Sequence, residues 1–95
     1  MRIFELENKN GKIVYLTYER WKHILSEHPY LHNKLDIIKE TLLYPISIKE
    51  NLYDSSVIFY YSHIKSERKY LFVAVKYLNN EGYIITSYYL NNLKK

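Results

Sequence analysis

The chain has 95 residues, which is too short for two hydrophobic cores that each fold alone, so we expect one domain over residues 1–95. It has no cysteine, which excludes disulfide bonds and thiolate metal sites. Fourteen Lys and Arg against ten Asp and Glu give a formal net charge of +4, a mild excess that favours polyanionic partners. The N-terminus does not resemble a secretory signal and no apolar run could span a bilayer, so we expect a cytoplasmic protein without membrane contact.

An N-terminal β-hairpin is the first expected element. Residues 2–7 and 12–17 have strand-like patterns and flank Asn10 and Gly11. The Asn-Gly pair favours the positive φ angles of a tight turn. The two strands should therefore pair antiparallel.

A helix is expected from residue 18 to residue 28. Thr17 is a suitable N-cap, and Glu19 in the first turn complements the helix dipole. Pro29 ends the helix because it disfavours α conformation at the preceding residue. At about 100° per residue, one stripe of this helix carries the side chains expected to face inward: Trp21, Ile24, Leu25 and His28.

His28 is the candidate functional residue of this helix. Its position on the stripe turns the imidazole inward, and its position in the last turn favours the protonated form, because the helix end carries partial negative charge. A cationic imidazole there could act as a general acid. The alternative is an interior histidine with a purely structural hydrogen bond.

A second helix over residues 33–44 follows, and four strands come after it. Leu35, Ile38 and Leu42 form the apolar stripe of the helix, and Pro45 ends it. Polar turns separate the later strands, so consecutive strands should pair antiparallel as a meander. The expected strands span residues 46–51, 57–64, 70–78 and 83–90. The fold class is therefore α+β, with an N-terminal hairpin and two helices packed on a twisted antiparallel meander.

The strand at residues 70–78 is apolar on both alternating sides as far as Lys76, which indicates a central strand. Alternation places Lys76 on one face with Tyr70, Phe72 and Ala74. In the last strand it separates Ile84, Thr86 and Tyr88 from Tyr83, Ile85, Ser87 and Tyr89. Lys76 should then neighbour either Thr86 or Ser87.

Together these side chains suit the cleavage of RNA without a metal ion. That reaction needs a base for the 2′-hydroxyl, a cation for the phosphorane and an acid for the leaving oxygen. A histidine, a lysine, a hydroxyl and tyrosines supply such groups. The alternative is that the lysine is solvated and the Thr or Ser hydroxyls are structural, as is usual on strands.

No metal or cofactor is expected. His23, His28 and His32 do not have the spacing of a metal site, because Pro29 separates the last two from a common helix face. The chain has two glycines, each in an expected turn, so it lacks a nucleotide-binding glycine loop.

Tyrosine is unusually frequent, with twelve in the chain against three Phe and one Trp. Its ring packs well on half-buried strands while its hydroxyl reaches water or a partner. The alternative role is a sheet face on which bases stack or phosphates bind.

The order of these motifs resembles a small bacterial and phage family of the barnase, EndoU, colicin and RelE-like (BECR) nuclease group. The likeness covers residues 12–93 and rests on five segments: His-x4-His-Pro at residues 23–29, TLLYP at 41–45, FYY at 59–61, KYLFVAVK at 69–76 and YIITSY at 83–88.

The resemblance implies a twisted four-stranded sheet that carries the active face, and RNA cleavage without a metal. Tyr61 and Lys69 match positions that line this face. The implied catalytic residues of this chain are His28, Lys76, Thr86 and Tyr88.

We therefore expect a metal-independent endoribonuclease, the toxin of a toxin-antitoxin or phage-conflict system. An antitoxin or immunity protein would be its protein partner. Lys65, Arg68 and Lys69 lie in or beside one expected turn and should add contacts to RNA. The alternative is a non-catalytic module that binds RNA or protein on the same fold.

Overall fold

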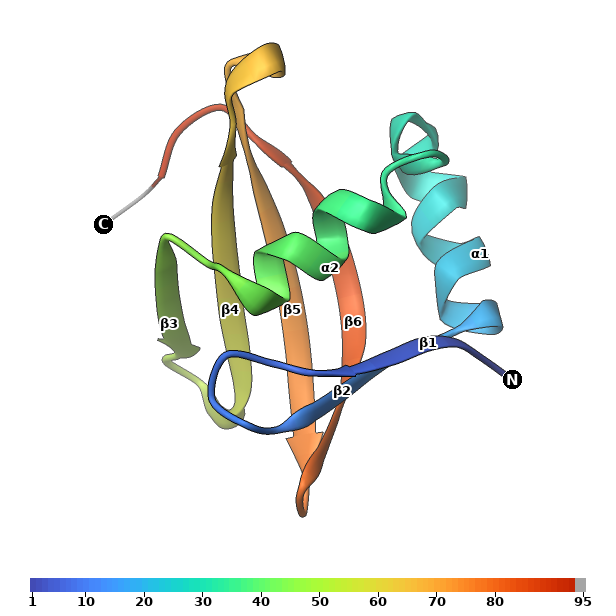
Figure 1. Ribbon diagram of the computed structural model, residues 1–95, viewed down its shortest axis with the longest axis vertical. Helices are drawn as coiled ribbons and strands as arrows, with labels where there is room; N and C mark the ends of the chain where they lie inside the picture. Colours follow the sequence, from blue (N-terminus) through green and yellow to red (C-terminus); the bar gives the residue numbers. More distant parts are fainter. Residues whose placement is uncertain (94–95) are drawn as a thin grey trace.

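The computed structural model describes residues 1–93, which form two α-helices, two short 3₁₀ turns and one six-stranded sheet (Figure 1). In chain order the elements are β1 (Arg2–Glu7), β2 (Ile13–Thr17), α1 (Tyr18–Glu27), a 3₁₀ turn (Pro29–Leu31), α2 (Leu35–Leu43), β3 (Ser47–Asn51), β4 (Asp54–Ile64), a second 3₁₀ turn (Lys65–Glu67), β5 (Lys69–Leu78) and β6 (Glu81–Leu90). The prediction of an α+β chain is confirmed. The largest error in a strand or helix boundary is the start of β4, which begins at Asp54 rather than at residue 57.

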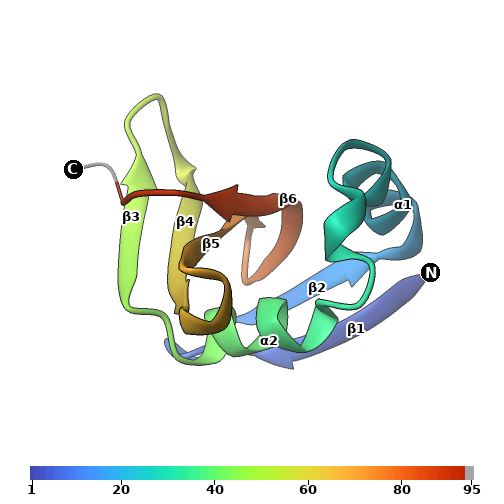
Figure 2. The same cartoon turned by 90° about the horizontal axis from the view of Figure 1, so that it is seen from above.

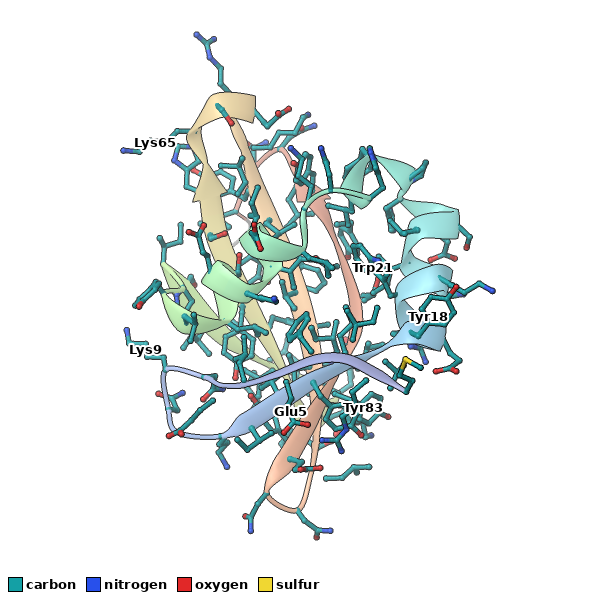
Figure 3. The ribbon with its side chains drawn as sticks, turned by 45° about the vertical axis from the view of Figure 1, so that its right-hand side comes forward. Glu5, Lys9, Tyr18, Trp21, Lys65 and Tyr83 are labelled. Carbon is teal, nitrogen blue, oxygen red and sulfur yellow. The ribbon has the colours of Figure 1, made fainter. Side chains whose placement is uncertain are left out.

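Helix α1 begins at Tyr18, as the sequence predicts, and ends at Glu27, so His28 lies just after the last turn and not within it as predicted. The side chain of Thr17 accepts a hydrogen bond from the Arg20 amide at 3.1 Å, which is the expected N-cap. His28 is the C-cap, and Pro29 opens the following 3₁₀ turn. Trp21 points from α1 toward the sheet (Figure 3). No helix within residues 1–93 is long and apolar enough to cross a bilayer.

The strand order in the sheet is β1-β2-β6-β5-β4-β3. Strands β3 to β6 form the expected antiparallel meander, with β5 in its centre. The N-terminal hairpin does not pack on this meander as expected but extends it, because residues 13–15 of β2 pair in parallel with residues 81–83 of β6. The sheet is therefore mixed. The last strand of a meander leaves one hydrogen-bonding edge unpaired, and β2 covers the first part of that edge.

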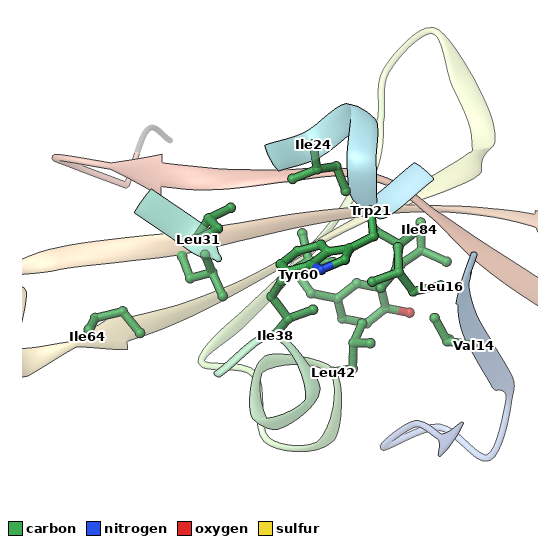
Figure 4. Packing of buried hydrophobic residues seen from close by; sticks show 13 residues of the cluster. Val14, Leu16, Trp21, Ile24, Leu31, Ile38, Leu42, Tyr60, Ile64 and Ile84 are labelled. Carbon is green, nitrogen blue, oxygen red and sulfur yellow. The ribbon is translucent and has the colours of Figure 1, made fainter. Parts of the chain in front are cut away.

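The helices lie on one side of the meander. Helix α2 crosses one face of β4 and β5, while α1 stands beside the edge of β6 (Figures 1 and 2). The main core fills the space between these helices, the hairpin and the sheet (Figure 4). Its largest fully buried side chains include Tyr60, Leu16, Ile24, Leu31, Ile38, Leu42, Leu71 and Ile84.

A β-bulge in β6 changes which side chains share a face. Ala74 pairs with Thr86, but Val75 pairs with Ile84, so Ile85 is an extra residue. Ile84 belongs to the main core, whereas Ile85 packs with Ala74 on the opposite face. The prediction that Ile84 shares a face with Thr86 is wrong, because strict alternation fails where one strand carries an extra residue.

A buried polar network fastens the turn of the N-terminal hairpin to the sheet. Asn8 is 5% exposed, and its amide donates hydrogen bonds to the hydroxyls of Tyr60 at 3.1 Å and Tyr77 at 2.8 Å. These two hydroxyls lie 2.6 Å apart. The side-chain oxygen of Asn8 accepts from the backbone amides of Asn10 and Lys12. Burial raises the pKa of both tyrosines, so the hydroxyls stay neutral.

Asn8→Ala is expected to lower the free energy of unfolding by about 1–3 kcal/mol, because it leaves buried donors and acceptors without their partner. Urea denaturation followed by circular dichroism measures this change. Asn10→Ala is the matched control, because its exposed side chain should be replaceable within about 0.5 kcal/mol. Equal stabilities of the two variants would contradict the role assigned to Asn8.

Candidate functional site

Helix α2 leaves one face of the meander uncovered, which we call the open face (Figure 2). This face carries most of the expected site residues. The strand register sets its side chains in three rows across β4, β5 and β6. The first row is Tyr61, Phe72 and Tyr88, the second is Phe59, Ala74 and Thr86, and the third is Val57, Lys76 and Tyr83.

His28 extends the first row beyond the edge of β6. Its ring centroid lies 5.2 Å from that of Tyr88. The imidazole is half-buried, so the histidine of the apolar stripe lies at the sheet edge rather than in the main core. Tyr30 holds this segment in place, because its hydroxyl accepts a hydrogen bond from the Tyr89 amide at 3.1 Å.

The same Tyr30 hydroxyl lies 3.4 Å from Nδ1 of His28, which is long for a hydrogen bond. Which of the two groups donates in this contact depends on which ring nitrogen of His28 carries the proton. To accept a proton at Nε2, a neutral His28 must carry its own proton on Nδ1, where it faces the Tyr30 hydroxyl oxygen. Because Nδ1 faces Tyr30, Nε2 is the nitrogen that would exchange a proton with a substrate.

Aromatic rings continue the first row across the sheet. The Phe72 centroid lies 4.8 Å from that of Tyr88 and 5.5 Å from that of Tyr61. Burial, and then the proximity of Tyr88, raise the pKa of Tyr61, which keeps its hydroxyl as a neutral hydrogen-bond donor. Although no helix covers this face, Phe72 is only 7% exposed, because the neighbouring side chains pack against it.

Thr86, rather than Ser87, lies on the open face. Thr86 is opposite Ala74 in the second row and is partly exposed. Ser87 is fully buried, and its hydroxyl donates to the Phe72 carbonyl at 2.8 Å. Of the two expected neighbours of Lys76, the threonine is therefore the one that reaches the same surface.

Lys76 in the third row has an acidic partner that the sequence did not indicate. Its ammonium lies 2.8 Å from a carboxylate oxygen of Asp54, the first residue of β4. Asp54 also accepts hydrogen bonds from the Ser56 amide and hydroxyl. The bond to Lys76, followed by those to Ser56, lowers the pKa of Asp54 to about 2, and the same contact raises the pKa of Lys76. The lysine is fully charged at neutral pH and partly neutralised by its neighbour.

The titration of Asp54 provides a direct check of this pair. We expect a midpoint of about 2 in the wild type and a midpoint shifted toward 3.8 in Lys76→Ala, because the ammonium is the main cause of the shift. The pKa of Asp54 is lower in the folded protein than its unfolded value of 3.8, so the ionised carboxylate stabilises the fold at pH values above 3.8. This contribution is lost as the pH falls through about 2. Carbon-13 chemical shifts of the carboxyl group measure the midpoint. An unchanged titration in Lys76→Ala, with Lys65→Ala as the control, would mean that the pair is not formed.

The rows also show how far apart the expected catalytic groups lie. Phe72 and Lys76 are four positions apart in β5, which corresponds to about 13 Å along the strand. His28 and Lys76 therefore flank Thr86 from opposite ends instead of meeting at one point.

The three basic residues expected to bind RNA lie elsewhere on the molecule. Lys65 and Arg68 are exposed at the β4–β5 connection, and Lys69 donates to the Asn91 side chain at 3.0 Å. Figure 3 shows Lys65 at the opposite end of the sheet from Tyr83, the partner of Lys76 in the third row. Of the four residues expected to bind substrate, only Tyr61 lies among the three rows.

Sequence reasoning missed Asp54, Tyr30 and Phe59. Tyr30 directly follows the His-Pro pair, which was a usable signal that it accompanies the histidine. Asp54, the first residue of β4, is 22 residues from Lys76 in the sequence, and no local pattern links the two. Within residues 1–93, no three His, Asp or Glu side chains are grouped as they would be around a metal ion.

Comparisons with known protein families, with curated proteins and with solved structures found no match.

Proposed function

We propose that the open face binds single-stranded RNA and cleaves it without a metal ion, by attack of a 2′-hydroxyl on the adjacent phosphorus. The observation that carries the proposal is the gathering of an imidazole, an ammonium and hydroxyls from distant segments onto one face. None of these groups is needed to build the main core, which lies on the other side of the sheet.

Each group has a task in this reaction. His28 supplies or accepts a proton at Nε2, either for the leaving 5′-oxygen or from the 2′-hydroxyl. Lys76 stabilises the charge that develops on the phosphorane oxygens. Thr86, Tyr88 and Tyr61 orient the phosphate by donating hydrogen bonds. The 2′-oxygen forms a bond to phosphorus as the 5′-oxygen leaves, so the products are a 2′,3′-cyclic phosphate and a 5′-hydroxyl.

Lys76 changes partner when RNA binds. In the free protein its ammonium holds the carboxylate of Asp54 at 2.8 Å. A phosphate beside Thr86 offers the same ammonium a second anion within the swing of its flexible side chain. Exchange of Asp54 for phosphate would bring the lysine from the third row to the second.

Incubation of the purified protein with a labelled single-stranded RNA tests this proposal. We expect cleavage that is unaffected by EDTA, with products that end in 2′,3′-cyclic phosphate, because all the proposed groups are protein side chains. Cleavage abolished by EDTA and restored by a divalent ion would contradict this mechanism.

A non-catalytic module that binds RNA or protein is the second candidate. The observation that favours it is the distance of about 13 Å between the rows of His28 and Lys76, together with the neutralisation of Lys76 by Asp54. Wild-type protein that binds RNA but does not cut it, even when ribosomes are added, would support this candidate.

The resemblance to BECR nucleases supports a more specific role as a cytoplasmic toxin that an antitoxin or immunity protein holds inactive. Such a partner would cover the open face. Co-purification of the product of a neighbouring gene, with loss of RNA cleavage in the complex, is the expected result.

A further inference from the structure

We propose that Tyr53, at the tip of the β3–β4 hairpin, is a stacking platform for an unpaired base of the RNA that occupies the open face. This inference rests on the RNA binding proposed above and adds a subsite at one side of it. It also names the substrate class as single-stranded RNA, because a paired base has no free ring face to offer.

The tip exposes two large apolar side chains. Leu52 and Tyr53 connect β3 to β4, and their exposed fractions are 93% and 95%. Such short hairpin connections favour Asn, Asp and Gly, which suit the turn and interact well with water. An exposed leucine and tyrosine add no buried surface to this fold, so they are candidates for contact with a ligand.

The tip borders a hollow on the open face. Leu52 and Tyr53 line this hollow together with Phe59 and Tyr61 of β4 and with Lys49, Glu50 and Asn51 of β3. The β3–β4 turn projects on the side of the sheet away from α2 (Figure 2). The hollow therefore combines aromatic rings with an ammonium group, which is the combination that sequence-tolerant binding of single-stranded nucleic acid uses.

The hollow is continuous with the proposed site. Phe59 belongs to the second row, where its register neighbours are Lys49 on one side and Ala74 on the other. Thr86 follows directly after Ala74 in the same row. The Phe59 ring centroid lies 5.0 Å from that of Phe72, which in turn packs against Tyr88. An RNA strand with a phosphate at Thr86 would therefore carry a neighbouring base over Phe59 and toward Tyr53.

Basic and acidic groups both border this path. Lys49 continues the second row onto β3, with its ammonium 6.0 Å from the centre of the Tyr61 ring, and Lys76 lies in the third row beside Asp54. Glu50 also lines the hollow, so the two ammonium groups are the ones assigned to the RNA phosphates. Base stacking contributes affinity without selecting a sequence, since every base has a π face. We therefore expect the platform to set the requirement for single strands, and not a base preference.

The affinity for a labelled RNA octamer, measured by fluorescence polarisation, tests the platform. The octamer is methylated at every 2′-oxygen, because methylation blocks cleavage. Tyr53→Ala should weaken binding by about five- to a hundredfold, the range measured for loss of one stacked base. Tyr53→Phe keeps the ring and should bind within about twofold of the wild type. Tyr44→Ala is the matched control, because Tyr44 is also strongly exposed, at 76%, but lines a different hollow beside α2.

Two further probes separate stacking from charge. With an octamer that lacks bases at all positions, wild type and Tyr53→Ala should bind equally. With a double-stranded RNA of the same sequence, the substitution should also have no effect. The platform would be overturned if wild type and Tyr53→Ala bound the base-bearing single strand equally. It would also be overturned if the wild type did not bind RNA. Either result would leave a protein partner as the occupant of the tip.

The cleavage proposal fails in a different way. If the wild type binds the methylated octamer through Tyr53 but does not cut the unmethylated one, the platform stands and the nuclease mechanism falls. If the wild type cuts RNA and Tyr53→Ala binds normally, the mechanism stands and the platform falls.

Discussion

Lys76→Ala is expected to lower the rate of RNA cleavage by about a hundredfold or more, because removal of a cation that stabilises a developing charge has an effect of this size. His28→Ala should cause a loss of similar size through the missing proton transfer. Neither side chain belongs to the main core, so both variants should fold.

Single-turnover cleavage of a labelled single-stranded RNA measures both effects, and circular dichroism confirms that each variant is folded. Lys65→Ala serves as the control, because it removes the same charge at the opposite end of the sheet and should change the rate by less than about threefold at physiological salt. A Lys76→Ala variant that retains wild-type cleavage would show that the ammonium stays with Asp54 throughout the reaction.

Trp21→Ala is expected to lower the free energy of unfolding by about 3–5 kcal/mol, which is a large fraction of the stability of a small domain. Trp21 is 7% exposed and packs in the main core between α1 and the sheet (Figure 4). Its replacement removes a large apolar surface and leaves a cavity that the rigid sheet cannot close.

The midpoint and slope of urea denaturation give this change. Tyr18→Ala is a control on the same helix, because Tyr18 is 49% exposed and should be replaceable at a cost of less than about 1 kcal/mol. If Trp21→Ala costs no more than Tyr18→Ala, then α1 does not anchor the sheet through its tryptophan.

The elements of this fold could be predicted because their signals are local. Thr17 caps α1 through atoms three residues away, and Pro29 ends the helix at its own position. In the hairpin turn Gly11 has the expected positive φ of 80°, whereas Asn10 lacks the positive φ predicted for the pair. The antiparallel meander follows from short polar turns between apolar runs, so neighbours in the sequence become neighbours in the sheet.

The arrangement of the site could be predicted only in part, because it depends on contacts between distant segments. Alternation along β5 correctly predicts that Lys76 shares a face with Phe72 and Ala74. In β6 the extra residue Ile85 interrupts the alternation, so the pattern places Ile84 on the wrong face. The approach of His28 to Tyr88 requires the whole path of α1, and the pairing of Asp54 with Lys76 requires the β4–β5 register. No periodicity in the sequence encodes these distances.

The short pairing between β2 and β6 has a consequence for how this fold could change. β2 leaves β6 after Tyr83, and further along β6 the Tyr89 amide donates a hydrogen bond to the Tyr30 hydroxyl instead of to a neighbouring strand. The hairpin and the histidine segment thus share one hydrogen-bonding edge between them. Lengthening β2 would extend the ladder and displace α1, so a variant could gain regular sheet at this edge only by giving up His28 beside Tyr88.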